Sequence, residues 1–208
     1  MGYLTFHNVN CATTFTFLSI NSVYVVDDED SFLMIGGYIK EDSGYSGRSF
    51  YFKRSDESWT EGPTMANIRG YFGCGSFNSE FHGGLITIAF GGWNGGRTIY
   101  DNSEVILQGS NAWVEGPSLP QNMFQMSTIE KPDRSGLYIV AGYSKGVGEL
   151  NSVMELTCPS SGCQWTVLEP KLQVPRAKHA AFLVFDFMFD CSKSNSTNVI
   201  KNQQNSIL

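Results

Sequence analysis

Short apolar stretches recur along the chain, separated by glycine and polar residues. Three of them end in a glycine: "SFLMIGG" at Gly37, "LITIAFGG" at Gly92 and "LYIVAG" at Gly142. Apolar runs of about four to eight residues between turn residues are typical of β-strands. No segment repeats apolar residues at helical spacing over a useful length. The pattern predicts an all-β chain.

A tryptophan follows each of these glycines at a similar distance and precedes a proline. "ESWTEGP" at 57–63 and "NAWVEGP" at 111–117 share the same phrase, and "CQWTVLEP" at 163–170 is a looser third copy. Two more strand-like pieces complete each unit of about 50 residues, which indicates an internal repeat of four short strands. The pieces before the glycines are 22–26, 71–77 and 125–130, and those after them are 49–54, 103–108 and 152–157.

A four-stranded sheet of this size cannot cover both of its faces alone, so packing against a neighbouring copy is expected. The glycines permit a positive φ at a tight turn, and the tryptophan supplies a large flat side chain between sheets. The predicted units are 21–66, 67–120 and 121–172, with a partial fourth at 173–186. Residues 1–20 are either an outer strand of a preceding unit or a stray strand, and the polar tail 187–208 is predicted to be disordered.

The arrangement resembles the kelch repeat. The resemblance rests on "LMIGG" and "IAFGG" with their later tryptophans, and on "PRAKHAAFLV" at 175–184, over about residues 22–186. It implies a β-propeller, here a partial one of about three four-stranded antiparallel blades plus the start of a fourth. Ala141 departs from the double glycine. The positions with an implied structural role are Gly36, Gly37, Gly91, Gly92, Gly142, Trp59, Trp113, Trp165, Arg176 and His179.

Composition and charge exclude several function classes. Hydrophobic residues make up 41% and charged residues 16%, which is a globular composition. The net charge of −6 and the absence of a Lys/Arg block disfavour nucleic-acid binding. No apolar run is long enough to span a membrane, and the N-terminus has no signal-peptide pattern. No catalytic or cofactor motif is present, so neither a catalytic residue nor a cofactor is predicted.

Cys158 and Cys163 bracket a predicted hairpin tip. A disulfide there is favoured over free thiols or a metal site. His7, His82 and His179 are too scattered in the sequence to suggest a metal cluster, so none is predicted. The cysteine pair and the glycosylation pattern at Asn195 lean slightly towards an extracellular location, although the compartment stays unassigned.

The loops after each glycine anchor combine aromatic and basic residues, a composition typical of protein-recognition surfaces. The chain is therefore interpreted as a non-catalytic scaffold that presents these loops to a protein partner of unknown identity. Two alternatives stay open: a truncated product without independent function, and a propeller enzyme similar to galactose oxidase. The candidate binding residues are Tyr45, Arg48, Trp93, Arg97, Tyr100, Tyr143 and Lys145.

Overall fold

The computed structural model describes residues 23–26, 30–39, 44–169 and 171–183. These residues form fourteen strands and no helix. No helix with the length and apolarity needed to cross a bilayer occurs in the described ranges. The chain is all-β, as the apolar pattern predicts.

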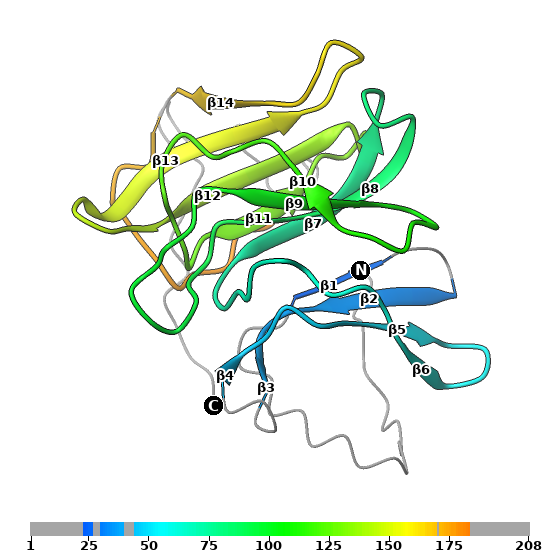
Figure 1. Cartoon of the computed structure of the whole chain (residues 1–208). Helices are drawn as coiled ribbons and strands as arrows, with labels where there is room; N and C mark the ends of the chain where they lie inside the picture. Colours follow the sequence, from blue (N-terminus) through cyan, green and yellow to red (C-terminus); the bar gives the residue numbers. More distant parts are fainter. Residues whose placement is uncertain (1–22, 27–29, 40–43, 170, 184–208) are drawn as a thin grey trace, which may run out of the picture.

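Twelve of the strands form three four-stranded antiparallel sheets, here called blades 1 to 3, which follow one another in space (Figure 1). Blade 1 has the order β1 (Val23–Val26), β2 (Ser31–Ile35), β5 (Ser49–Lys53) and β6 (Ser58–Glu61). Blade 2 consists of β7 (Gly73–Ser79), β8 (Gly84–Phe90), β9 (Ser103–Leu107) and β10 (Val114–Glu115). Blade 3 consists of β11 (Ser127–Glu130), β12 (Gly136–Ser144), β13 (Gly148–Thr157) and β14 (Gln164–Leu168).

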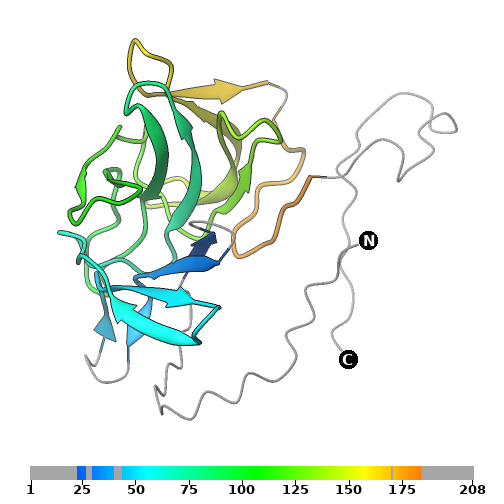
Figure 2. The ribbon, with the colours of Figure 1, turned by 90° about the vertical axis from the view of Figure 1, so that its right-hand side faces the viewer.

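The innermost strands of successive blades, β1, β7 and β11, lie next to one another, and the sheets fan out from them (Figure 2). This is the arrangement of a partial propeller, as predicted. One element was not predicted: the two-stranded hairpin of β3 (Tyr38–Ile39) and β4 (Gly44–Tyr45), which interrupts blade 1 between β2 and β5. Of the predicted terminal segments, 1–20 and 187–208 lie outside the described residues.

The chain crosses from blade to blade in the same way each time. The carbonyls of Arg69, Met123 and Arg176 accept hydrogen bonds from the N–H groups of Gly37, Gly92 and Gly142, at 3.1, 2.8 and 2.9 Å. Two residues further on, Tyr71, Gln125 and Lys178 adopt left-handed φ values of 55°, 58° and 54°. Residues 176–178 therefore repeat the crossing where the fourth blade is predicted to start, although 173–183 contain no strand.

The glycine pair has a left-handed backbone in every copy. Gly36 and Gly91 have φ values of 59° and 61°, and Ala141 takes the same conformation at 52°. The departure from Gly-Gly in the third copy thus leaves the turn intact. An alanine can adopt this conformation only with strain.

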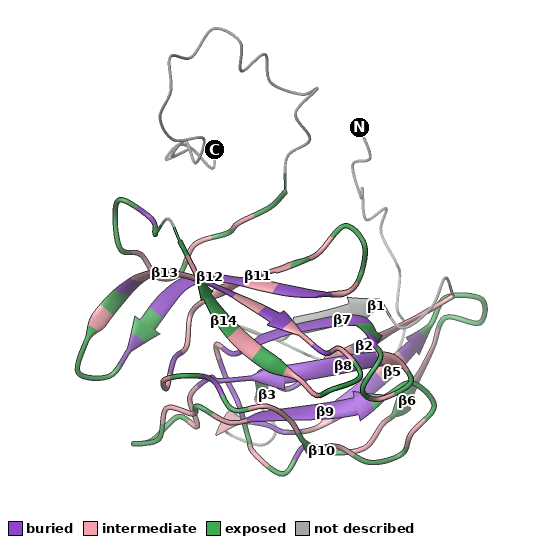
Figure 3. Ribbon diagram, turned by 90° about the horizontal axis from the view of Figure 1, so that it is seen from above, coloured by how far each residue is buried: buried purple, intermediate pink, exposed green. Residues whose placement is uncertain are grey.

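The core lies between the blades, where buried residues concentrate (Figure 3). Leu33 and Ile35 of blade 1 pack with Cys74, Ala89 and Ile106 of blade 2. The second interface is larger and includes Phe77, Ile88 and Phe90 of blade 2 with Leu137, Ile139 and Leu156 of blade 3.

The tryptophans join adjacent blades. The Nε1–H of Trp113 donates to the carbonyl of Pro63 in the preceding unit at 2.9 Å, and Trp165 donates to Pro117 at 3.1 Å. Each proline carbonyl also accepts a serine hydroxyl from its own blade, Ser49 at 2.7 Å and Ser103 at 2.8 Å. The repeated tryptophan and Gly-Pro phrases therefore meet across the blade interfaces.

Candidate functional site

Six aromatic side chains form a continuous row across the three blades. We call this set the aromatic row. Neighbouring ring centroids lie between 5.4 and 6.5 Å apart, within the range of favourable aromatic pairs. Its members are Tyr38, Tyr45, Tyr71, Trp93, Phe124 and Tyr143.

The backbone pairing of the crossings holds the row in place. Trp93 exchanges two backbone hydrogen bonds with Gly70, at 2.8 and 2.9 Å, and Tyr143 does the same with Phe124, at 3.0 and 2.8 Å. Tyr38, Trp93 and Tyr143 all directly follow the glycine anchor of their blade. One residue from each repeat is therefore brought to the same end of its blade.

Two glycines leave room for the ring of Tyr45. A side chain at Gly70 would collide with this ring, and a Cβ on Gly95 would lie 2.9 Å from it. The hairpin β3–β4 thus carries Tyr45 over blade 2, where it contacts both Tyr71 and Trp93. The row is continuous between blades 1 and 2 because these two positions lack side chains.

The row is partly desolvated but reachable. Tyr38 and Tyr143 are each 37% exposed, and the four rings between them are half-buried. Burial, a side-chain hydrogen bond with Tyr71 and the nearby Tyr71 and Tyr38 raise the pKa of Tyr45 to about 12. Tyr45 is therefore a neutral phenol throughout the physiological pH range.

The other four predicted binding residues have different surroundings. Arg48 pairs with Glu61 at 2.9 Å and lies over the ring of Phe50. Tyr100 lies beneath the guanidinium of Arg69, 4.9 Å from ring centroid to Cζ. Arg97 and Lys145 are exposed: Arg97 lies in the loop between β8 and β9, and Lys145 lies in the short turn between β12 and β13.

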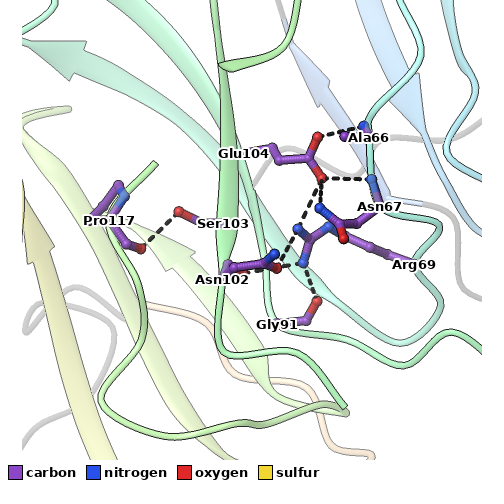
Figure 4. Close-up of polar contacts among 8 residues, drawn as sticks. All are labelled: Ala66, Asn67, Arg69, Gly91, Asn102, Ser103, Glu104 and Pro117. Carbon is purple, nitrogen blue, oxygen red and sulfur yellow. Dashed lines mark hydrogen bonds and ion pairs between the residues drawn. The ribbon is translucent and has the colours of Figure 1, made fainter. Parts of the chain in front are cut away.

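A buried ion pair supports the first crossing, just before Tyr71 (Figure 4). Arg69 is 0% exposed, and its guanidinium lies 3.0 Å from a carboxylate oxygen of Glu104, itself only 6% exposed. Arg69 also donates to the carbonyl of Gly91 at 2.6 Å and to the side chain of Asn102 at 2.7 Å. The ion pair therefore links the crossing segment to β9 of blade 2.

Glu104 is held in its charged form. Burial alone would raise its pKa, but hydrogen bonds from Asn67, Arg69 and the backbone of Ala66 outweigh burial and hold the pKa below the ordinary value. Ala66 N–H and Asn67 N–H donate to the carboxylate at 2.7 and 3.1 Å. A charge-assisted network of this kind fixes the direction of the crossing segment.

Cys158 and Cys163 form a disulfide, as the sequence predicts. The structure places His82 beside them, with Nδ1 3.9 Å from Sγ of Cys163. His82 lies beside the disulfide because the fold brings the hairpin tips of blades 2 and 3 together, a proximity that the spacing of the histidines in the sequence does not reveal. His179 is half-buried next to blade 3, where burial and the charge of Arg176 lower its pKa.

Sequence reasoning missed several members of these sites, including Tyr71, Phe124 and Glu104. Tyr71 and Phe124 lie at crossings whose residue types vary from copy to copy, so no repeat pattern identifies them. Gly70 and Phe124 occupy equivalent positions in their repeats, which becomes visible only in the structure, where Gly70 pairs with Trp93 as Phe124 pairs with Tyr143. Glu104 directly precedes the apolar residues of the strand "SEVIL", and an acidic residue at such a position is a signal for a buried ion pair.

No known family model matches the chain, and no curated protein matches it. Among solved structures it is similar to one titled "Structure of YjhT", with a TM-score of 0.61 and 12% sequence identity. The match covers 76% of this chain and 54% of the other, so the chain spans about half the length of that structure. At this identity the likeness concerns the fold alone.

Proposed function

We propose that the chain is a kelch-type propeller segment that acts as a non-catalytic protein-interaction scaffold, with the aromatic row as its binding surface. One observation carries the proposal: aromatic side chains from all three blades form an uninterrupted, partly exposed row. Tyrosine and tryptophan contribute most to binding energy at protein interfaces, since they offer a large rigid surface with a polar edge.

The chemistry of the row suggests the kind of partner. The hydroxyls of Tyr38, Tyr45 and Tyr143 can donate to backbone carbonyls, while the rings accept apolar side chains. Arg97 and Lys145 are exposed cations that closely follow the row members Trp93 and Tyr143 in the sequence. A short extended peptide with apolar residues and at least one carboxylate matches this surface.

The proposal is tested by selecting peptides from a displayed random library on the immobilised chain and measuring their Kd by fluorescence polarisation. Tyr38→Ala and Tyr143→Ala remove the exposed ends of the row. Each is expected to raise Kd roughly 30-fold, the effect of losing about 2 kcal/mol at an interface hot spot.

Phe182→Ala is the matched control, because Phe182 is also an exposed aromatic residue, 77% accessible, but is not part of the row. Its Kd should equal that of the parent chain. Circular dichroism establishes that all three variants stay folded. Enriched peptides that bind the Tyr38→Ala/Tyr143→Ala double variant as tightly as the parent would contradict the proposal.

A further inference from the structure

The hairpin tips of blades 2 and 3 meet at the periphery of the molecule. The turn between β7 and β8 contains Glu80, Phe81 and His82, and the loop between β13 and β14 runs from Cys158 to Cys163. Phe81 N–H donates to the carbonyl of Cys158 at 3.2 Å, and Ser160 N–H donates to the carboxylate of Glu80 at 3.3 Å. These bonds fix the position of one tip against the other.

This contact brings three metal-ligating side chains together. The ligand atoms of His82, Cys158 and Cys163 all lie within 4.8 Å of one another, and no other such group of three occurs in the described part of the chain. The turn itself orients His82, because Ser79 Oγ lies 2.8 Å from Nδ1 and also accepts the His82 N–H at 3.1 Å.

The distances suit a tetrahedral zinc ion once the disulfide is opened. Zinc–sulfur bonds of about 2.3 Å and zinc–nitrogen bonds of about 2.0 Å place the ligand atoms roughly 3.5–3.8 Å apart. The distance between His82 Nδ1 and Cys163 Sγ is already 3.9 Å. Two changes are required: the two sulfur atoms must separate, and His82 Nδ1 must exchange its hydrogen bond with Ser79 Oγ for the metal ion.

We propose that the reduced chain binds a thiophilic divalent cation, Zn²⁺, through the thiolates of Cys158 and Cys163 and the imidazole of His82, with the fourth position open to water. The oxidised chain cannot bind it, because both sulfur atoms are then used in the disulfide. Two sulfur ligands and one nitrogen ligand form a donor set that binds zinc in preference to harder cations such as Mg²⁺ or Ca²⁺, which take oxygen ligands.

The disulfide form and the zinc-binding form interconvert by reduction and oxidation of the bond between Cys158 and Cys163. A dithiol reductant transfers two electrons and two protons to the Cys158–Cys163 bond, giving two thiols and the disulfide of the reductant. Zinc binding then releases the two thiol protons to solvent. The disulfide closes a loop within blade 3, whereas the zinc ion would join blade 3 to the turn of blade 2.

Cobalt is the probe, because thiolate-bound Co²⁺ absorbs light and Zn²⁺ displaces it. The experiment uses the full chain with Cys11 and Cys191 replaced by serine, reduced with a dithiol that is then removed without oxygen. We expect one Co²⁺ per chain with thiolate-to-cobalt absorption that disappears on adding Zn²⁺. The unreduced chain should bind none.

His82→Ala should weaken Co²⁺ binding by about tenfold or more and change the spectrum, since the donor set loses its nitrogen. Cys163→Ser should weaken Co²⁺ binding and reduce the thiolate absorption, since only the Cys158 thiolate is then left. His179→Ala is the matched control and should bind like the parent. The proposal is overturned if the reduced parent binds no Co²⁺, or if His82→Ala binds it with unchanged affinity and spectrum.

Discussion

At the scale of the residue, Arg69 and Glu104 are the most consequential pair. At the next blade interface Met123 is equivalent to Arg69, because the carbonyl of each accepts the N–H of the second glycine in its turn. Met154 is equivalent to Glu104, because Met154 pairs with Ile139 across the strands as Glu104 pairs with Ala89. The same position is thus filled once by a buried ion pair and once by two apolar side chains. A lone buried charge is strongly destabilising, while a well-packed apolar pair is tolerated.

Glu104→Gln is therefore expected to lower the free energy of unfolding by about 3 kcal/mol, because it leaves Arg69 charged and buried without a counter-ion. Urea denaturation measures the change. The matched control is the double variant Arg69→Met/Glu104→Met, which copies the second interface and should lose less stability than Glu104→Gln alone. A larger loss in the double variant would contradict this account.

The same pair determines a pH dependence. The pKa of Glu104 in the folded chain lies below its ordinary value of 4.5, so the unfolded chain takes up the proton first as the pH falls. Its contribution to stability is fully present above about pH 4.5 and is lost as the pH falls through the lower, folded pKa. In Glu104→Gln the part of the acid-induced loss of unfolding free energy that comes from protonation of Glu104 should be absent. Denaturation midpoints at a series of pH values, compared with those of the parent chain, measure the difference.

Ala141 offers a second prediction at this scale. Ala141→Gly and Ala89→Gly both remove a buried methyl group, but only Ala141 has a left-handed backbone. Relief of that strain should make Ala141→Gly less destabilising than Ala89→Gly by about 1–2 kcal/mol. Equal losses of unfolding free energy in thermal denaturation would show that the turn is unstrained.

At the scale of the element, the tryptophans define how blades join. Trp113 and Trp165 each donate to a carbonyl of the preceding unit, whereas the indole N–H of Trp59 has no acceptor within the described residues. All three side chains are half-buried, so they form a matched series.

Trp113→Phe and Trp165→Phe should each cost about 1 kcal/mol more than Trp59→Phe, the net value of one hydrogen bond. Denaturant midpoints of the three variants test this ordering. If Trp59→Phe proved equally destabilising, the effect would come from lost ring area and not from the bond between blades.

The strands themselves follow from the sequence to a large degree. The apolar runs at 49–54, 103–108 and 152–157 correspond to β5, β9 and the end of β13, because a short apolar run between turn residues specifies a strand locally. The hairpin β3–β4 was not predicted, since its two-residue strands are too short to show a period. In the site, aromatic residues after the glycine anchors were found, but Tyr71, Phe124 and His82 depend on contacts between blades that no local pattern encodes.

At the scale of the whole molecule, each blade is joined to its neighbour by the same small set of contacts. Backbone hydrogen bonds link the successive crossings. Gln125 N–H donates to the carbonyl of Tyr71 at 2.8 Å, and Lys178 N–H donates to the carbonyl of Gln125 at 3.1 Å. Stability in such a stack is approximately a sum over units and their interfaces. The aromatic row and the meeting of the two hairpin tips are properties of this stack and exist in no single blade.

The ion pair between Arg69 and Glu104 limits how the gene could recombine among its own repeats. Joining residue 69 directly to residue 124 would remove one period and set Arg69 against Met154, with no carboxylate to neutralise it. A duplication that placed Met123 at the position of Arg69 beside a second copy of Glu104 would leave that carboxylate buried without a positive partner. The first and second crossings are therefore not interchangeable, and the charge pair of Arg69 and Glu104 fixes which blade can follow which.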